Sequence, residues 1–246
     1  MIALSNVTKR LGGQMVLDGL SLEIERGETM VIIGRSGSGK SVALKHMVGL
    51  MRADSGTVTV DGVAVGGLHA AAMFELRRKF GMLFQSGALI NWLNVFDNVA
   101  LPLREHTRMK PDAIRQEVMQ RLGLLELDDH AEKMPADLSG GMRKRAGLAR
   151  AIILDPQIIL YDEPTSGLDP VMGSRINQLI VDVKNELKVT SVVVTHDMDS
   201  AYRVGDRIAM LYGGRIVQVG SPDEIRNSDN GIVRQFVEGR IGGPMD

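Results

Sequence analysis

A glycine-rich segment, Gly34 to Ser41, constrains this chain more than any other feature. Its sequence, GRSGSGKS, fits the pattern G-x-x-x-x-G-K-[ST] of phosphate-binding loops. The apolar run Thr29–Ile33 before it predicts a buried strand, and Lys40 to Leu50 after it predicts a helix. A phosphate site needs backbone N–H groups that converge at a helix N-terminus. The order strand, loop, helix therefore favours a nucleotide site over an ordinary glycine-rich turn.

The residue types within this loop suit that chemistry. Glycines let the backbone wrap around phosphate groups without Cβ clashes. We expect Lys40 to bridge the β- and γ-phosphates and the Ser41 hydroxyl to bind Mg²⁺. The residues predicted to bind the nucleotide are those of the loop: Gly34, Arg35, Ser36, Gly37, Ser38, Gly39, Lys40 and Ser41.

A second apolar run ends in two acidic residues. Ile158 to Tyr161 precedes Asp162 and Glu163, and open α/β sheets place ligand chemistry at the carboxyl ends of their strands. Asp162 is suited to the Mg²⁺ shell, and Glu163 to polarising an attacking water molecule. An acid after a strand is by itself more often a solvated helix cap. In a chain that also has a phosphate-binding loop, we expect both carboxylates to act on the nucleotide.

Composition excludes several other classes of protein. The 246 residues carry a net charge of −1, whereas a chain that neutralises a nucleic-acid backbone is visibly basic. The absence of cysteine excludes a disulfide framework and fits a reducing compartment. The longest apolar runs fall well short of the ~18 residues of a membrane helix, and the N-terminus has no signal-peptide pattern. We expect a globular cytosolic protein with no nucleic-acid partner.

The rest of the pattern predicts an α/β fold. Apolar runs at 157–161 and 190–195 alternate with helical segments at 143–153 and 171–187, which is typical of a parallel sheet. The fold class predicted is thus a P-loop NTPase core with a mainly parallel sheet.

Two additions to this core are expected. Alternating segments before residue 30 and at 57–65, around Asp61-Gly62, predict an antiparallel β layer, and 207–219 predicts a hairpin. Residues 97–134 have helical spacing only, and therefore predict a helical insert.

The segment Leu138-Ser139-Gly140-Gly141-Met142 opens a predicted helix with small residues. Taken alone, it fits an ordinary serine N-cap as well as a second anion site. The order of all the motifs is more specific: it runs through the phosphate-binding loop, Gln85, Leu-Ser-Gly-Gly, the Asp-Glu strand, Ser166-Gly167-Leu168-Asp169 and His196. In this order the chain resembles the nucleotide-binding subunit of ABC transporters over about residues 2–225.

The resemblance implies an ABC ATPase fold and a head-to-tail homodimer that buries ATP and Mg²⁺ between two copies. The segment Ser139-Gly140-Gly141 of one copy would face the phosphate-binding loop of the other copy, and Ser139 and Gly141 would bind the γ-phosphate there. Asp169 would link the two sites across the interface.

Two further site residues follow from the same resemblance. His196 would contact the γ-phosphate and hold the attacking water molecule together with Glu163; the alternative is a helix-capping or core histidine. Gln85 would join the Mg²⁺ shell and sense the membrane partner.

One position departs from the family pattern. Many members place an aromatic side chain in the first hairpin to stack on adenine, and this chain has Leu11 there. A leucine keeps apolar contact but loses ring stacking, which contributes about 0.5–1.5 kcal/mol in aromatic pairs. We therefore hypothesise weak base discrimination, so that GTP is accepted beside ATP.

Segments after the phosphate-binding loop indicate which group of ABC ATPases the chain resembles. FQSGAL (84–89), NVFDNV (94–99), PLREHT (102–107) and GGMRKRA (140–146) are similar to the Mla/Mce phospholipid-transport ATPases of Gram-negative bacteria, the MlaF type. This implies an ATP-hydrolysing motor that moves phospholipid between inner and outer membranes, bound peripherally to the cytoplasmic face of the inner membrane. The alternatives are an importer or exporter ATPase for another small solute, or a soluble ABC ATPase outside transport.

The resemblance also implies partners: an integral-membrane permease, an MCE-domain lipid carrier and a STAS-domain subunit. Leu89, Trp92 and Phe96 place apolar bulk just after Gln85, where a groove for a permease helix is expected; the alternative is the insert's own core. Trp92, the only tryptophan, is the favoured contact because tryptophan is enriched at interface hot spots.

A basic run on the helix after Leu-Ser-Gly-Gly and the C-terminal tail allow further predictions. Arg143, Lys144 and Arg145 are interpreted as a solvated helix face rather than a lipid-headgroup or nucleic-acid contact. A single domain is expected, with a core at 1–86 and 155–225, a helical subdomain at 87–154 and a tail at 226–246. The tail's Gly242-Gly243-Pro244 leaves two alternatives, a disordered end or an arm that docks on the dimer or an accessory subunit.

Overall fold

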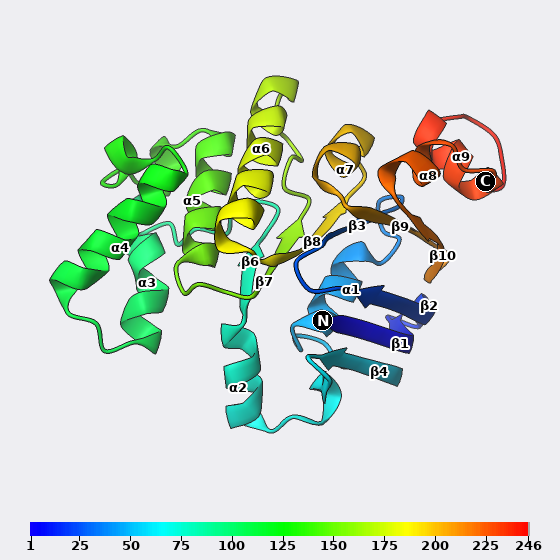
Figure 1. Cartoon of the computed structure of the whole chain (residues 1–246), viewed down its shortest axis with the longest axis horizontal. Helices are drawn as coiled ribbons and strands as arrows, with labels where there is room; N and C mark the ends of the chain where they lie inside the picture. Colours follow the sequence, from blue (N-terminus) through cyan, green and yellow to red (C-terminus); the bar gives the residue numbers. More distant parts are fainter. Residues whose placement is uncertain (246) are drawn as a thin grey trace. The chain divides into compact units, whose positions relative to one another are not determined.

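The computed structural model describes residues 1–245, which form two compact units (Figure 1). The first unit contains residues 1–77 and the chain from residue 190 onward, and the second unit is the continuous segment Arg78–Val189. Within the described residues, no helix has both the length and the apolar character required to cross a membrane.

The first unit contains an antiparallel sheet with the strand order β2-β1-β4-β5. Its strands are β1 (Ile2–Leu11), β2 (Gln14–Ile24), β4 (Ser55–Val60) and β5 (Val63–Ala64). The inward positions are apolar and buried: Ile2 of β1 pairs with Ile24 of β2 and with Val60 of β4. This is the antiparallel layer predicted from the alternating pattern, since one face of such a sheet packs on a core.

The first unit also contains the parallel strands that lead to the phosphate-binding loop. Strand β3 (Thr29–Ile33) lies between β8 (Thr190–Thr195) and β9 (Arg207–Tyr212), and is parallel to both. Strand β10 (Arg215–Gly220) pairs antiparallel with β9. All residues of β3 and β8 are buried, which explains why they read as continuous apolar runs instead of alternating.

Helices of the first unit flank these strands. They are α1 (Lys40–Met47), most of α2 (Ala70–Arg78), α7 (Met198–Val204), α8 (Pro222–Arg226) and α9 (Gly231–Glu238). Helix α1 contacts β2, β4 and β8, while α7 packs on β3 and β8. The helix that follows the phosphate-binding loop is therefore supported by both sheets of its unit.

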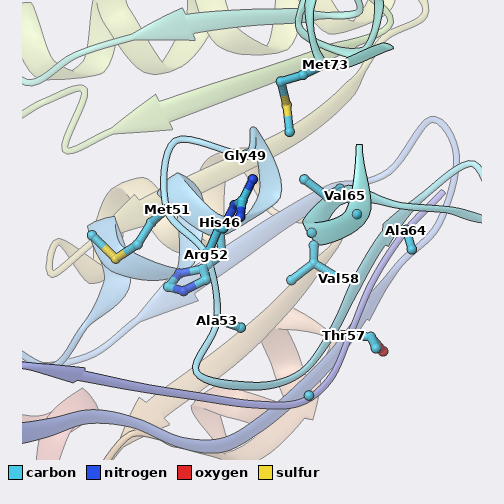
Figure 2. A pocket seen from close by; sticks show the side chains of 13 residues that line it. His46, Gly49, Met51, Arg52, Ala53, Thr57, Val58, Ala64, Val65 and Met73 are labelled. Carbon is cyan, nitrogen blue, oxygen red and sulfur yellow. The ribbon is translucent and has the colours of Figure 1, made fainter. Parts of the chain in front are cut away.

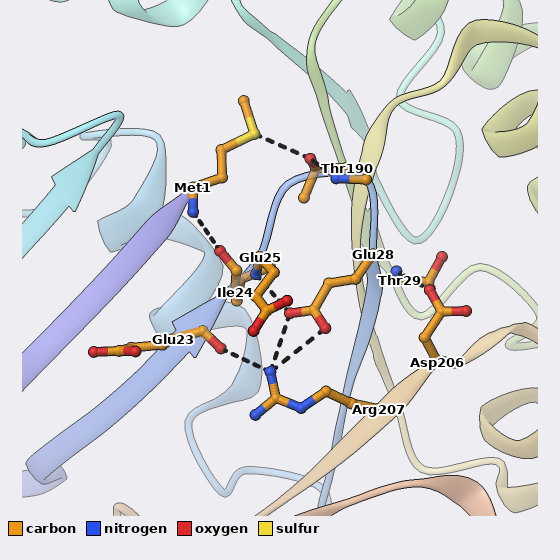
Figure 3. A network of polar contacts seen from close by, with 10 residues as sticks. Met1, Glu23, Ile24, Glu25, Glu28, Thr29, Thr190, Asp206 and Arg207 are labelled. Carbon is orange, nitrogen blue, oxygen red and sulfur yellow. Dashed lines mark hydrogen bonds and ion pairs between the residues drawn. The ribbon is translucent and has the colours of Figure 1, made fainter.

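A polar network anchors the connection from β2 to β3 (Figure 3). The Met1 ammonium donates to the Ile24 carbonyl at 2.7 Å, and the Thr29 amide donates to Asp206 at 2.6 Å. Arg207 donates to both carboxylate oxygens of Glu28, at 3.3 and 3.4 Å. Strand β3 therefore enters the sheet from a fixed start, which constrains the loop at its other end.

The described part of the C-terminal tail folds back on the first unit. Met245 is 8% exposed; its amide donates to Gln235 Oε1 at 2.8 Å, and its carbonyl accepts from Arg35 at 2.9 Å. Tyr212 donates to the Pro244 carbonyl at 3.2 Å. The interpretation of the tail as a disordered end is therefore wrong for residues up to 245, because buried contacts hold it. Its role as an arm toward a partner stays a prediction.

The second unit combines a strand pair with helices. Strands β6 (Phe80–Leu83) and β7 (Ile158–Asp162) are parallel neighbours. The helices are α3 (Val95–His106), α4 (Pro111–Leu124), α5 (Gly140–Ile152) and α6 (Pro170–Leu187), with short 3-10 turns at 128–130 and 135–137. Helix α5 (green in Figure 1) packs against α3, α4 and β6.

The predicted fold class is confirmed, with parallel and antiparallel sheets and a helical region. The strands predicted at 29–33 and 190–195 match β3 and β8, and β7 begins and ends one residue later than predicted. The sequence pattern predicted neither β6 nor the helices α2, α7, α8 and α9. The division of the chain at residues 87, 155 and 226 stays a prediction.

Candidate nucleotide-binding site

The phosphate-binding loop joins β3 to α1 in the first unit, and two of its glycines are required by close contacts. A Cβ on Gly34 would lie 2.5 Å from the Leu211 carbonyl oxygen and 2.9 Å from Ser38 Oγ. Gly39 has φ of +103°, and a Cβ there would lie 3.1 Å from the Val16 carbonyl. Only glycine fits at such positions, so the loop holds its shape through backbone packing.

Lys40 is packed against the backbone of the loop where the phosphate cradle is predicted. Lys40 is 6% exposed, and its Nζ donates to the carbonyl oxygens of Gly34, at 2.8 Å, and Arg35, at 3.2 Å. Helix α1 begins at Lys40, directly after Gly39, so its first turn offers backbone N–H groups and the positive end of the helix dipole. Residues 35–37 at the tip of the loop are exposed. This arrangement suits a polyphosphate anion that approaches from solvent.

His196 lies at the same edge of the sheet as the loop. It directly follows β8, whose last residue, Thr195, pairs with Ile33, the last residue before the loop. The helix cap is a different residue: Asp197 accepts from the amides of Asp199, at 3.0 Å, and Ser200, at 3.3 Å. His196 itself is exposed. The alternatives of a capping or a core histidine are therefore wrong.

Leu11 ends β1 at the tip of the first hairpin. It is 39% exposed, so an apolar side chain is left at the surface of the unit that contains the loop. In the same hairpin, the Val16 carbonyl borders Gly39. An exposed leucine on a hairpin that borders the phosphate-binding loop is consistent with an apolar contact to the nucleotide base. That contact stays a prediction.

The carboxylates and Gln85 lie in the second unit. Asp162 is the last residue of β7, and Glu163 follows it. Leu83 of β6 pairs with Tyr161, so Gln85 and Asp162 emerge at the same edge of the two parallel strands. Gln85 Nε2 donates to Ser166 Oγ at 3.3 Å. Gln85, Asp162 and Glu163 thus follow the ends of two neighbouring parallel strands, β6 and β7.

Glu163 has an unusual backbone conformation. Its φ is +49°, in the left-handed region that few residues other than glycine adopt. Such a conformation costs on the order of 1–3 kcal/mol and persists where surrounding contacts fix it. The Ser166 amide donates to the Glu163 carbonyl at 3.2 Å, which closes a turn just after the strand. Strained backbone at a proposed catalytic carboxylate is a common feature of active sites.

The interpretation of Arg143, Lys144 and Arg145 as a solvated face is wrong for two of these residues. Lys144 is 4% exposed and Arg145 is 7% exposed. Arg145 donates to the carbonyls of Leu125, at 3.2 Å, and Glu126, at 3.0 Å. The charged groups are buried because backbone carbonyl oxygens accept their hydrogen bonds, and such acceptors leave no signature in a sequence.

The segment Ser139-Gly140-Gly141 forms the N-terminus of α5. Ser139 is exposed and caps the helix, its Oγ accepting from the Met142 amide at 3.3 Å. A Cβ on Gly141 would lie 2.5 Å from Met172 Cε, so the helix start packs directly on α6. Asp169 caps α6 by accepting from Val171 and Met172, both at 3.0 Å. The serine N-cap interpretation is confirmed, and the contact with a second copy stays a prediction.

Trp92 lies on a loop that is hydrogen-bonded to helix α3. It is 80% exposed, whereas Leu89 and Phe96 are half-buried. The buried Asn98 side chain accepts from the Ile90 amide at 2.7 Å and donates to the Leu93 carbonyl at 2.9 Å, which fixes this loop. Trp92 is therefore outside the core of the helical region, although Leu89 and Phe96 pack partly within it.

The residues present fit ATP and Mg²⁺. Ser38 Oγ is buried with no hydrogen-bond partner among the described residues, beside the cradle that a Cβ on Gly34 would fill. Ser41, Gln85 and Asp162 carry oxygen donors, which Mg²⁺ prefers. Residues 1–245 contain no cluster of three or more His, Asp or Glu residues able to hold a metal ion.

The structure distributes the predicted site over both units. The first unit contains the loop from Gly34 to Ser41, Leu11 and His196. The second unit contains Gln85, Ser139 to Gly141, Asp162, Glu163 and Asp169. A separate cavity of about 340 Å³ in the first unit, beside His46, Met51 and Met73 (Figure 2), includes none of these residues.

Three comparisons place the chain among known proteins. Residues 17–166 match the family described as ABC transporter. The probable ribonucleotide transport ATP-binding protein mkl of Mycobacterium leprae is 45% identical over 99% of this chain and 70% of its own length. The intermembrane phospholipid transport system ATP-binding protein MlaF of Haemophilus influenzae is 38% identical over 100% of this chain and 93% of its own length.

The solved structures that resemble this chain include ATP-binding cassettes as well. A dimeric post-hydrolysis state of the ATP-binding cassette MJ0796, bound to ADP and Pi, superposes with a TM-score of 0.83. It is 36% identical and covers 90% of this chain and 99% of that chain.

Proposed function

The chain belongs to the ABC transporter family as an ATP-binding, Mg²⁺-dependent ATPase subunit, and we propose that it powers phospholipid transport between the inner and outer membranes of a bacterium. The observation that carries this proposal is the similarity to MlaF, which extends over the full length of this chain and nearly all of that protein. The segments 84–107 and 140–146 support the same assignment.

The proposed chemistry assigns a role to each group. Lys40 and the loop amides bind the β- and γ-phosphates, while Ser41, Gln85 and Asp162 hold Mg²⁺. Glu163 polarises the attacking water molecule, and His196 contacts the γ-phosphate. Bound Mg²⁺ would neutralise charge that develops on the phosphate oxygens. The left-handed backbone of Glu163 and the position of His196 beside the loop support these two roles.

The proposed working form is a homodimer. The dimeric cassette with ADP and Pi supports pairing of two copies around nucleotide. In this proposal the α5 start, Ser139 to Gly141, contacts the γ-phosphate bound to the other copy, and Asp169 links the two sites. The exposure of Ser139 and Asp169 leaves both available for such contacts.

The remaining partners belong to the proposal as well. A membrane permease would contact the surface near Leu89, Trp92 and Phe96, and place this chain on the cytoplasmic face of the inner membrane. An MCE-domain lipid carrier and a STAS-domain subunit would complete the complex. The exposed Trp92 on its hydrogen-bonded loop supports the permease contact, since tryptophan is enriched at interface hot spots.

Ribonucleotide transport is the second candidate function. The relatives named for it are more similar in sequence than MlaF, at 45% against 38% identity. The ATPase machinery is the same for either cargo, so the two candidates differ in the membrane partners and in what they carry.

One experiment separates the candidates. The chain is tagged in its native host, and the membrane complex that co-purifies is analysed for proteins and lipids by mass spectrometry. We expect an MCE-domain protein and bound phospholipid. The complex is then placed in liposomes, where ATP should drive movement of a fluorescent phospholipid. ATP-driven uptake of labelled ribonucleotide, with no phospholipid movement, would overturn the proposal; a Glu163→Gln complex serves as the control without turnover.

A further inference from the structure

Lys144 is a buried cation whose three N–H groups all reach one short segment. Its Nζ donates to the carbonyl oxygens of Glu163 at 3.1 Å, Pro164 at 2.6 Å and Ser166 at 2.7 Å. An ammonium group has three N–H donors and no acceptor, so this set uses its full capacity. All of these residues belong to the second unit.

Packing alone does not account for a lysine at this position. Burial of a charged group is unfavourable unless its hydrogen bonds are satisfied, and an apolar side chain of similar length would fill the same space. The neighbouring charged groups on α5 bind elsewhere: Arg143 donates to the Leu138 carbonyl, and Arg145 to Leu125 and Glu126. Lys144 is thus the residue of this helix that is directed at the segment after β7.

That segment needs external support. Glu163 adopts a left-handed backbone, and Lys144 binds the carbonyl oxygen of Glu163 itself. The next two acceptors belong to Pro164 and Ser166, so the whole turn is tied to the middle of α5. A strained conformation persists only where such contacts over-determine it.

Ser166 joins three predicted functional elements. Its hydroxyl accepts from Gln85, its carbonyl accepts from Lys144, and it begins the segment that ends at Asp169. Helix α5, which contains Lys144, begins at the Ser139 cap. A displacement of the start of α5 is therefore transmitted to the backbone of Glu163 through one side chain.

We propose that Lys144 is a positioning residue for ATP hydrolysis, which fixes the backbone of Glu163 to Ser166 against the helix that begins at Ser139. The inference rests on the proposed role of Glu163. It assigns Lys144 no contact with substrate: the lysine sets where the Glu163 carboxylate lies, and so how well it holds the attacking water molecule.

The charge of Lys144 gives this role a pH signature. Burial lowers the pKa of Lys144 to about 8, and the nearby Glu163 carboxylate opposes that shift. Above this pH the neutral amine has two N–H groups for three carbonyl oxygens. One hydrogen bond to the turn is then lost, and the turnover number should fall on the alkaline side.

The test measures kcat and KM for ATP in full-length protein, alone or with its co-purified membrane partners, whichever shows wild-type activity. Lys144→Met should lower kcat by about 10- to 100-fold, because small misplacements of catalytic groups have effects of this size. The KM should change much less, since the phosphate-binding loop is untouched. Lys133→Met, at an exposed lysine of the same unit, is the matched control and should keep kcat within about threefold, as expected for a surface residue outside the positioning contacts.

Lys144→Arg provides the second measurement. A guanidinium keeps its charge at all accessible pH values, so this variant should retain part of the activity and lack the fall in kcat above about pH 8. An unchanged kcat in Lys144→Met, or the same alkaline fall in Lys144→Arg as in wild type, would overturn the proposal. If Lys144→Met does not fold, the comparison of pH profiles between wild type and Lys144→Arg decides.

Glu163→Gln is measured in the same assay to separate the two hypotheses. An inactive Glu163→Gln with a normal Lys144→Met means that Glu163 is the base and Lys144 does not position it. Near-wild-type turnover in Glu163→Gln means that the assignment of the base fails, and the positioning role of Lys144 fails with it.

Discussion

Helices α1 and α5 both begin at glycine-rich segments predicted to bind phosphate, but their N-termini are built differently. Before α1 stands Gly39, which has no side chain to cap the helix, and the adjacent Lys40 is bound to loop carbonyls. Before α5 stands Ser139, whose hydroxyl already accepts from the Met142 amide. One N–H group of the α5 start is thus bound by the helix's own cap, whereas α1 has no side-chain cap.

This difference suggests an order of events. A phosphate group at α1 meets a loop shaped by close backbone contacts at Gly34 and Gly39. A phosphate group at α5 meets a helix start at which the Met142 N–H is already bound to Ser139 Oγ. We therefore expect binding at α1 first and more tightly, and engagement of α5 second. The chemistry depends on neither helix start alone, since Glu163 follows β7.

The largest expected effect separates binding from chemistry. Glu163→Gln should lower ATP turnover by about 10²- to 10⁴-fold, the usual contribution of a general base, because an amide does not accept a proton from water at neutral pH. ATP binding at α1 should remain close to wild type, as measured by equilibrium dialysis with labelled ATP. Turnover near the wild-type rate would place the base elsewhere.

The second effect tests the α1 side of the comparison. Lys40→Ala removes the cation predicted to bridge the β- and γ-phosphates and should weaken ATP binding by about 10- to 100-fold, since hydrogen bonds to charged groups contribute about 1.5–3 kcal/mol. Lys45→Ala is the matched control, because Lys45 is exposed in the last turn of the same helix. Equal losses in both variants would show a general charge effect in place of a specific contact.

The third effect tests the α5 side. Ser139→Asp keeps a capping oxygen but adds a negative charge, so stability should hold while ATP-dependent dimer formation and turnover fall. Ser139→Ala should instead lose the cap and about 1 kcal/mol of unfolding free energy. Urea unfolding and size-exclusion chromatography with ATP distinguish the two. Normal ATP-dependent dimers of Ser139→Asp would contradict a phosphate contact at this helix start.

The smallest effect concerns the base instead of the phosphates. Leu11→Tyr should raise ATP affinity by about 2- to 10-fold, since aromatic pairs gain about 0.5–1.5 kcal/mol. Preference for ATP over GTP should rise with it, as measured by competition binding. Leu11→Met keeps a flexible apolar side chain and should leave both quantities unchanged. If Leu11→Tyr changes neither, the hairpin does not contact the base.

The sequence predicts the strands next to the site well because their residues are buried on both faces. Both strands form as expected, at Thr29–Ile33 and Thr190–Thr195. Neither has a solvent-facing side, so polar residues do not alternate with apolar ones along them. Strand β6 was missed for the opposite reason. It is short and includes Gly81, where a Cβ would lie 2.3 Å from the Ala151 carbonyl, so its glycine reflects close packing and not a turn.

Site residues could be predicted where a sequence motif specifies the side chain. They could not be predicted where a side chain is held by hydrogen bonds to backbone groups. Gly34 to Ser41, Asp162 and Glu163 follow from their pattern and from the strands before them. The burial of Lys144 does not follow from a pattern. Its three acceptors are backbone carbonyl oxygens that lie 19 to 22 residues later in the sequence. Met245 was also unpredictable, since a glycine-rich tail gives no sign that Gln235 and Arg35 bind its backbone.

The discontinuity of the first unit has a consequence for protein synthesis. Strand β3 pairs with β8 and β9, so it has no parallel partner until the ribosome has passed residue 190. The second unit, residues 78–189, is continuous and emerges from the ribosome before β8 does. Domains generally fold as units during translation. The segment with the proposed catalytic carboxylate is therefore able to fold first, and the sheet that supports the phosphate-binding loop is completed last, although the loop itself is made early.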